Sequence, residues 1–240
     1  MRRPEFIARQ SRCPSGLLGW LIAKVMAVET APANMRALDL LELQTTDRVL
    51  DVGCGHGRTV ERAASMVPEG FVAGVDLSER MVRMARRRNR RYIEAGRVEI
   101  KNGDSARIPY PERSFDKVCS VHTLYFWPDP QRHLREVHRV MKSGGRFVLG
   151  FGPKEDEQAA SQFPGSVYRF YTSEEVGNLL RQVGFTQIET TSVQAGGRDI
   201  VFAAARARAQ EPVEEPHPML RHAQHERIPT LISKDFSRSP

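Results

Sequence analysis

The residues most suited to chemistry cluster in one short glycine-rich loop. An apolar run, residues 49–52, leads into this loop, which has glycine at positions 53, 55 and 57. Alternate glycines let a backbone turn sharply and lie close to a ligand, because no Cβ stands in the way. Asp51 adds a carboxylate at the entrance to the loop. This arrangement predicts a binding site for a nucleoside-containing cofactor.

A second carboxylate narrows the choice of cofactor. Asp76 follows the next apolar run, residues 71–75, and an acid in this place can accept hydrogen bonds from both hydroxyls of a ribose. NAD and S-adenosylmethionine both carry such a ribose. The dinucleotide fingerprint requires a third glycine at position 58, where this chain has arginine. The loop therefore favours S-adenosylmethionine, which has no pyrophosphate.

Strands and helices alternate from residue 48 onward. Seven strands are predicted, at 49–52, 71–75, 98–100, 115–121, 146–150, 185–189 and 199–205. Helices are predicted at 58–67, 79–94 with Ser78 as cap, 130–141, and 173–183 with Thr172 or Ser173 as cap. The alternation is typical of an α/β fold, here a Rossmann-like, doubly wound, mainly parallel seven-stranded sheet with helices on both faces. Ligands bind such sheets at the carboxyl ends of the strands, where the glycine loop is expected.

The chain is expected to divide into three parts. Residues 1–45 show apolar residues at helical spacing and are predicted to form a helical lid segment. Residues 46–206 are predicted to form the cofactor-binding domain. Residues 207–240 lose the alternating pattern and mix proline with both charges, which predicts a disordered tail. Three histidines in that tail suggest a metal site less strongly than a solvated tail, so no metal is assigned.

Composition limits the classes of protein. The 240 residues are 40% hydrophobic, which suits one globular domain with a substantial core. The three cysteines are an odd number and widely spaced, which suggests neither a disulfide framework nor a cysteine metal site. Without a bilayer-length apolar run or a secretory leader in this sequence, we expect a cytoplasmic location. The net charge of +7 favours anionic partners but names none.

Five motifs in order carry a resemblance to a known family. They are residues 49–57, residues 75–78 followed by Met81, residues 103–105, residues 114–118 and residues 140–146. From about residue 48 to 190 the chain resembles the class I S-adenosylmethionine-dependent methyltransferases, of the methyltransferase type 11 or UbiE-like kind. Ser143 departs from the pattern, because it replaces the usual proline before Gly144. The resemblance implies an enzyme that transfers a methyl group.

The resemblance also implies which residues hold the cofactor. The loop backbone would pack on the methionine and ribose parts, Asp76 would hold the ribose diol, and Asp104 would accept from the adenine amino group. Asp51 would orient the loop, or the ligand amino group through water. For Asp51 and Asp104 the alternative is a local role at a strand end or turn. The implied set is Asp51, Gly53, Cys54, Gly55, Gly57, Asp76, Leu77, Met81, Gly103, Asp104, Ser105 and Ser120.

The segment after the fourth strand, residues 121–127, is expected to face the reacting methyl. Methyl transfer by in-line displacement mainly needs alignment, and a base is needed only where the acceptor must lose a proton early. His122 and Tyr125 are the polar candidates, His122 as a base near neutral pH and Tyr125 as a hydrogen-bonding group. The alternative is that His122 only packs or bonds locally.

A small molecule with an oxygen, nitrogen or carbon nucleophile is the expected acceptor. The segment 121–127 lacks the Asn/Asp/Ser-Pro-Pro-Tyr/Phe run of enzymes that methylate base nitrogens or glutamine amides. Arginines between 83 and 91 leave open a phospholipid or RNA methyltransferase with a basic surface, unless they lie over apolar neighbours. A non-catalytic cofactor-binding protein is the third alternative.

Overall fold

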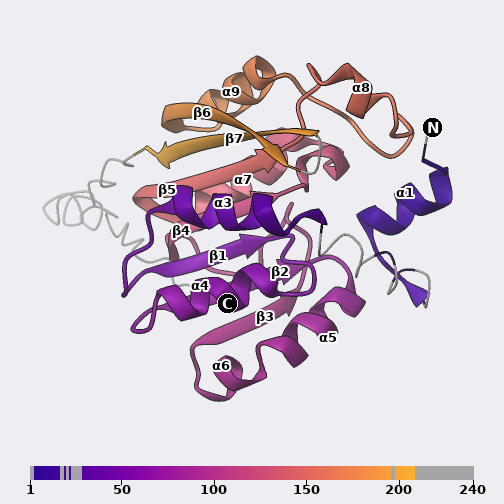
Figure 1. Ribbon diagram of the computed structural model, residues 1–240. Coiled ribbons are helices and arrows are strands. Elements are labelled where there is room, and N and C mark those ends of the chain that lie inside the picture. Colours follow the sequence, from indigo (N-terminus) through magenta and orange to yellow (C-terminus); the bar gives the residue numbers. More distant parts are fainter. Residues whose placement is uncertain (1–2, 17–18, 20–21, 23–28, 196–197, 209–240) are drawn as a thin grey trace, which may run out of the picture. The chain divides into compact units, whose positions relative to one another are not determined.

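A seven-stranded sheet in the order β3-β2-β1-β4-β5-β7-β6 forms the centre of the fold (Figure 1). The computed structural model describes residues 3–16, 19, 22, 29–195 and 198–208. β1 to β5 run parallel, whereas β7 runs antiparallel to β5 and β6. The predicted mainly parallel sheet is therefore confirmed. The strands are β1 (Arg48–Val52), β2 (Phe71–Asp76), β3 (Val98–Asn102), β4 (Phe115–Val121), β5 (Met141–Phe151), β6 (Phe185–Ala195) and β7 (Arg198–Ala207).

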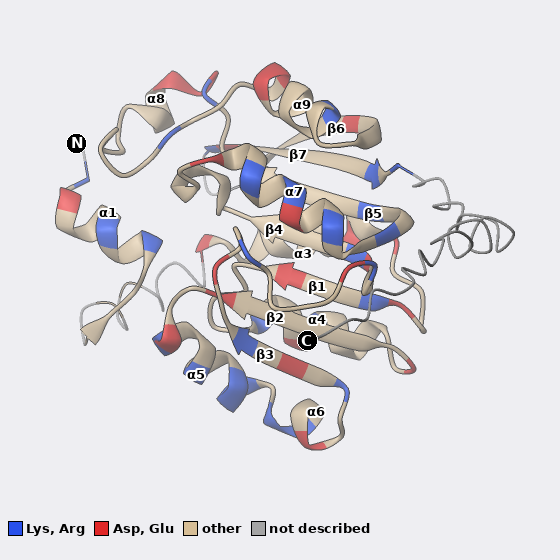
Figure 2. Ribbon diagram, turned by 180° about the vertical axis from the view of Figure 1, so that it is seen from behind, with Lys and Arg blue, Asp and Glu red and all other residues tan. Residues whose placement is uncertain are grey.

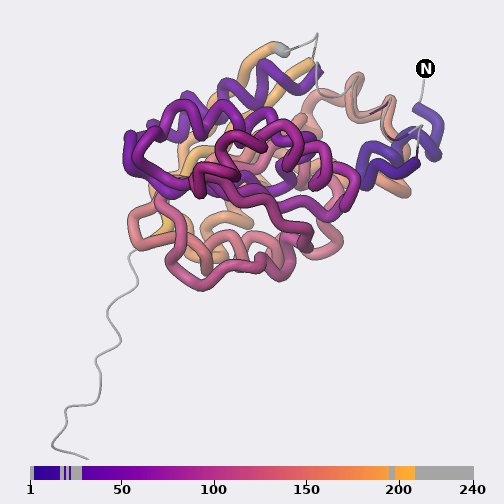
Figure 3. The backbone as a smooth tube through the Cα atoms, turned by 90° about the horizontal axis from the view of Figure 1, so that it is seen from below, coloured from indigo at the N-terminus to yellow at the C-terminus, as the bar shows by residue number. Residues whose placement is uncertain are grey.

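Helices cover both faces of the sheet, because successive residues of a strand point to opposite faces. Val49 shares one buried cluster with α3, α4 and α5, and Leu50 shares the other with α7 and α9. Seen from below, the purple helices near the N-terminus and the pink α7 lie on opposite sides (Figure 3). The helices are α3 (Ala31–Leu41), α4 (Arg58–Met66), α5 (Glu79–Arg88), α7 (Pro130–Val140) and α9 (Ser173–Gln182). Shorter elements are α1 (Glu5–Arg12), α6 (Arg90–Glu94), η1 (Leu124–Phe126) and α8 (Glu157–Ala160).

Side-chain caps fix where the main helices begin. Ser78 Oγ accepts a hydrogen bond from the Met81 amide at the start of α5. Thr172 forms a capping box at the start of α9, in which Glu175 bonds back to the Thr172 amide. These caps satisfy amides that the first helical turn leaves unpaired. The predicted starts of both helices are confirmed.

The predicted helix over 79–94 is wrong in one respect, because it breaks at Asn89. The buried Asn89 side chain donates to the carbonyls of Ala85 and Gly57, both at 2.9 Å. The hydrogen bond to the Gly57 carbonyl is not part of a regular helix. It ties the end of α5 to the glycine loop. The sequence pattern carries no signal for this contact, because Gly57 lies 32 residues away.

Strands β5, β6 and β7 extend beyond their predicted bounds. The start of β5, before the predicted strand 146–150, includes Lys142, whose Nζ donates to both carboxylate oxygens of Asp116, at 2.8 and 3.0 Å. β6 is an edge strand whose second half is polar and pairs with β7. The polar residues of an edge strand face water, and for this reason a search for apolar runs ends the strand too early.

Blue bands along α5 in Figure 2 mark its Lys and Arg positions, and several of these arginines bond other parts of the fold. Arg86 donates two hydrogen bonds to the Ile100 carbonyl, at 3.0 and 2.8 Å. Arg88 donates to the His56 carbonyl and pairs with Glu61, both at 3.2 Å. Ion pairs within single helices join Arg83 to Glu79 and Arg90 to Glu94. These contacts favour a structural role over an RNA or lipid patch.

The N-terminal segment divides into two parts, one around α3 and one around α1. α3 packs its buried face, including Leu38, onto the sheet, so it is part of the layered core, where the sequence predicted a lid. The segment around α1 is joined to the fold by the Pro14 carbonyl, which accepts from Ser78 Oγ at 2.8 Å. Of the predicted lid segment 1–45, residues 1–2, 17–18, 20–21 and 23–28 lie outside the described residues. The predicted tail does so from residue 209 onward.

Within the described part of the chain, no helix combines the length and apolar character needed to cross a membrane.

Asn89→Ala should lower the free energy of unfolding by about 1–3 kcal/mol, because the buried carbonyls of Gly57 and Ala85 each lose one of their two donors and the tie between them. Urea unfolding followed by circular dichroism measures this. Arg87→Ala, at an exposed position of the same helix, is the control and should change it by less than about 0.5 kcal/mol. Equal effects of the two substitutions would contradict the role given to Asn89.

Candidate functional site

The glycine loop connects the end of β1 to the start of α4 in left-handed backbone conformations. Gly53, Gly55 and Gly57 have φ values of 78°, 52° and 79°. A Cβ at Gly53 would lie 2.3 Å from a methyl group of Thr123, and one at Gly57 would lie 2.7 Å from Ala85 Cβ. A Cβ at Gly55 would meet nothing within 4 Å. Gly53 and Gly57 thus permit close packing against neighbouring side chains, whereas the space beside Gly55 is open.

Asp76, at the end of β2, binds this loop directly. One carboxylate oxygen accepts from the Gly55 amide and the other from the Ser78 amide, both at 2.8 Å. Burial raises the pKa of Asp76, and the two amide hydrogen bonds oppose this shift. Each oxygen keeps a second lone pair with which it can accept from a ligand hydroxyl.

Asp51 is a buried carboxylate that also lines the cavity. Burial raises its pKa to about 7, and the Cys119 thiol, with Sγ 3.7 Å from Asp51 Oδ1, lowers it only in part. A carboxylate in this setting gains stability from a bound cation. The neighbouring Cys54 side chain lies against Gly74, where a Cβ would come within 2.9 Å of its sulfur.

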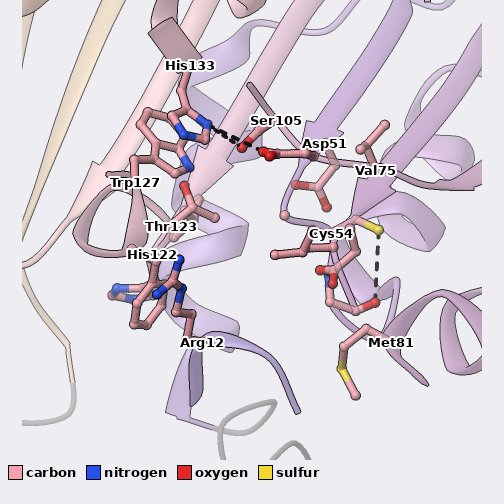
Figure 4. Close-up of a pocket in the computed structure, with 18 of the residues that line it drawn as sticks. Arg12, Asp51, Cys54, Val75, Met81, Ser105, His122, Thr123, Trp127 and His133 are labelled. Carbon is pink, nitrogen blue, oxygen red and sulfur yellow. Dashed lines mark hydrogen bonds and ion pairs between the residues drawn. The ribbon is translucent and has the colours of Figure 1, made fainter. Parts of the chain in front are cut away.

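The opposite wall of the cavity is built by the turn after β3 and by α7 (Figure 4). Asp104 accepts from the Ala106 amide at 2.8 Å, and Ser105 Oγ lies 2.8 Å from His133 Nδ1. The His133 ring stacks on Trp127 with ring centroids 5.0 Å apart. Sequence reasoning missed His133, because a histidine on an amphipathic helix resembles a surface residue until the turn after β3 is placed beside it.

Together these residues surround a cavity of about 330 Å³ at the carboxyl ends of β1, β2 and β4. The N-terminal segment also lines the cavity, through Ser11, Arg12 and Pro14. Figure 4 labels Arg12 among these lining residues. Predicted site residues brought together here are Asp51, Gly53, Cys54, Gly55, Asp76, Leu77, Met81, Gly103, Asp104, Ser105 and His122.

Three predicted site residues do not line this cavity. Gly57 packs against α5, which explains its conformation without a ligand. Ser120 is buried, and its hydroxyl donates to the Val52 carbonyl at 2.9 Å. Tyr125 lines a second cavity of about 200 Å³.

His122 lies between the two cavities and lines both. Its φ of 59° is in the left-handed region, an uncommon conformation that is often found at functional sites. His122 Nδ1 lies 3.0 Å from the Tyr125 hydroxyl, which in turn accepts from the Gly152 amide. Burial, helped by Arg198, lowers the pKa of His122 to about 4, so the ring is neutral near pH 7.

Comparison with known proteins gives one family and several relatives. A family model described as a methyltransferase domain matches residues 50–149. The 27-O-demethylrifamycin SV methyltransferase of Amycolatopsis mediterranei is 36% identical over 115 residues, which is 48% of this chain and 42% of that protein. The demethylmenaquinone methyltransferase of Symbiobacterium thermophilum is 37% identical over 103 residues, which is 42% of this chain and 41% of that protein. The chain thus spans less than half the length of both relatives.

A solved structure with a similar fold is that of the [4+2]-cyclase SpnF, with a TM-score of 0.65 at 21% identity. The likeness covers 75% of this chain and 82% of that chain. At this identity it concerns the fold alone.

The raised pKa of Asp51 leads to a pH-dependent stability. Between about pH 4, where an unfolded aspartate ionises, and about pH 7, the native carboxyl keeps a proton that the unfolded chain has released. Asp51 therefore makes the free energy of unfolding fall as pH rises, by about 1 kcal/mol per pH unit within this window. Asp51→Asn should remove that slope.

Urea unfolding of the ligand-free protein at several pH values between 4 and 8 measures it. Asp39→Asn, at an exposed position on α3, is the control and should keep the slope of the unchanged protein. A slope in Asp51→Asn equal to that of the control would contradict a protonated Asp51.

Proposed function

We propose that this chain, which belongs to the class I S-adenosylmethionine-dependent methyltransferases, transfers a methyl group from S-adenosylmethionine to a small-molecule acceptor. The observation that carries the proposal is a pair of neighbouring cavities with His122 in the wall of both. When bound, S-adenosylmethionine supplies a sulfonium-activated methyl: the acceptor nucleophile bonds the methyl carbon while the carbon–sulfur bond breaks, the electron pair stays on sulfur, and the acceptor proton goes to solvent.

The residues of the larger cavity fit each part of this cofactor. Asp76 has acceptor capacity left for the ribose hydroxyls, and the open space at Gly55 leaves room for the sugar beside the backbone. Asp51, a buried acid that lines the same cavity, would hold the ammonium group. The Leu77 side chain, 53% exposed, would lie against adenine. Asp104 and Ser105 line the cavity wall formed by the turn after β3 and would bind the adenine edge.

His122 and Tyr125 would align the acceptor. The Gly152 amide donates to the Tyr125 oxygen, so the phenol proton is available to His122 Nδ1. This tautomer leaves the proton of the neutral imidazole on Nε2, from which it can donate a hydrogen bond to an acceptor. With a pKa of about 4, His122 acts better as an orienting group than as a strong base.

We also propose that residues 3–14 act as the lid of the larger cavity. These residues are the part of the N-terminal segment that precedes α3 and does not pack on the sheet as α3 does. Arg12 and Pro14 line the cavity, and the Ser78–Pro14 hydrogen bond joins this segment to the residue beside Asp76. A cytoplasmic location is supported by the three cysteines, all unpaired, which suit a reducing compartment.

Isothermal titration with S-adenosylhomocysteine tests the cofactor site. Asp76→Asn should weaken binding by about 1–3 kcal/mol, because the carboxylate loses acceptor capacity toward the ribose diol. Glu79→Gln, at an exposed acid at the start of α5, removes the same charge and should leave the affinity unchanged.

No binding of S-adenosylhomocysteine by the unchanged protein would refute the proposed function. Binding without methyl transfer to any member of a broad acceptor panel would favour the non-catalytic alternative.

A further inference from the structure

The smaller cavity opens the question of which acceptors the protein takes. It shares His122 and Phe126 with the larger cavity, so a molecule held in it lies next to the residue that faces both. Its remaining walls come from the N-terminal part of the chain up to the start of α3, from the residues after β5, from α8 and the segment between α8 and α9, and from the start of β7. This cavity differs from the cofactor cavity in chemistry, because aromatic rings form much of its lining, together with two arginines and three acids.

The aromatic rings form a continuous wall. Tyr125 lies with its ring centroid 5.8 Å from that of Tyr168 and 5.1 Å from that of Phe170. Tyr168 in turn lies 4.8 Å from Phe126 and 4.7 Å from Phe163. Flat apolar surfaces of this kind favour a planar ring, which can pack edge-on or offset against them.

Two guanidinium groups make cation–π contacts with the ring of Phe163. Arg3 lies 4.8 Å and Arg198 lies 5.4 Å from its centroid. Arg3 also pairs with Glu29, at 3.8 Å. Arg198 forms no ion pair within 4.0 Å with any carboxylate of the described residues. Its charge lowers the pKa of His122 after the larger effect of burial, which agrees with a guanidinium directed into the cavity.

The three acids of the cavity already have partners within the protein, and Glu29 is the one that pairs with Arg3. Asp156 caps α8 by accepting from the Ala159 amide at 3.0 Å, and its second oxygen accepts from the Asp199 amide at 3.3 Å. Asp199 accepts from the side chain of Gln194. An ammonium ligand would therefore compete with bound donors and with two guanidinium groups, whereas an anion would meet the unpaired Arg198. A guanidinium binds a carboxylate through two parallel hydrogen bonds.

We propose that the smaller cavity holds a methyl acceptor that is a planar aromatic molecule with a carboxylate, and that Arg198 binds this carboxylate. The inference rests on the proposed function, because it assigns the acceptor of the same enzyme. Tyr125 and Phe170 would contact the ring, and His122 would face the nucleophilic atom from the side of the cofactor cavity.

The test compares matched catechols in the presence of S-adenosylhomocysteine. The probes are 3,4-dihydroxybenzoate, its methyl ester, and dopamine, which carries an ammonium group instead. In isothermal titration the acid should bind at least about tenfold more tightly than the ester, a typical effect of one charge-assisted pair. Arg198→Gln should reduce this preference to within about twofold, and Arg198→Lys should keep part of it, since lysine retains the charge but not the paired donors.

Arg169→Gln is the matched control, because Arg169 also stacks on an aromatic ring, that of Tyr171 at 5.0 Å, but lines neither cavity. It should keep the full preference for the acid. Tighter binding of dopamine or of the ester, or no binding of any probe, would overturn the assignment of the acceptor. S-adenosylhomocysteine binding is measured separately in the unchanged protein and in each variant. If the unchanged protein does not bind it, the proposed function is refuted rather than the assignment of the acceptor.

Discussion

The hydrogen bonds of the Asp76 carboxylate are the interaction on which the rest of the site depends. One oxygen holds the Gly55 amide of the loop after β1, and the other holds the Ser78 amide at the start of α5. Ser78 then donates its side-chain proton to the Pro14 carbonyl. A single buried acid thus joins the loop, the helix and the N-terminal segment that surround one cavity. Its cost in desolvation is offset by backbone donors, which leave lone pairs for a ligand.

The second constraint is the placement of His122. A left-handed backbone at this residue, with its amide donating to the Gly150 carbonyl at 2.8 Å, holds the ring between the two cavities. The hydrogen bond to Tyr125 and the donor at Gly152 then fix the ring from the side of the smaller cavity. Alignment of two reactants needs little else from the protein, because an activated methyl requires geometry more than acid–base chemistry.

The parts predicted well from the sequence are those that local pattern determines. The parallel strands, the caps at Ser78 and Thr172, and the meeting of the glycine loop with Asp76 follow from apolar runs and short-range chemistry. The break at Asn89 does not, because its partner Gly57 is distant in sequence. β6 was predicted too short because its second half is polar.

The smaller cavity was the least predictable part of the site. Its lining combines η1, the segment before α9 and the start of β7, which lie far apart in the sequence. Arg198 and Phe163 meet only because β7 returns antiparallel beside β5. The arginines around α5, by contrast, bond carbonyls and acids of neighbouring elements, which favours the structural alternative.

A crystal structure of the protein with S-adenosylhomocysteine tests the central claim most directly. The account predicts ribose hydroxyls within hydrogen-bonding distance of the Asp76 carboxylate, the ligand ammonium near Asp51, and the sulfur directed toward His122. A ligand whose ribose lies away from Asp76, or whose sulfur points away from the cavity lined by Tyr125 and Arg198, would contradict it.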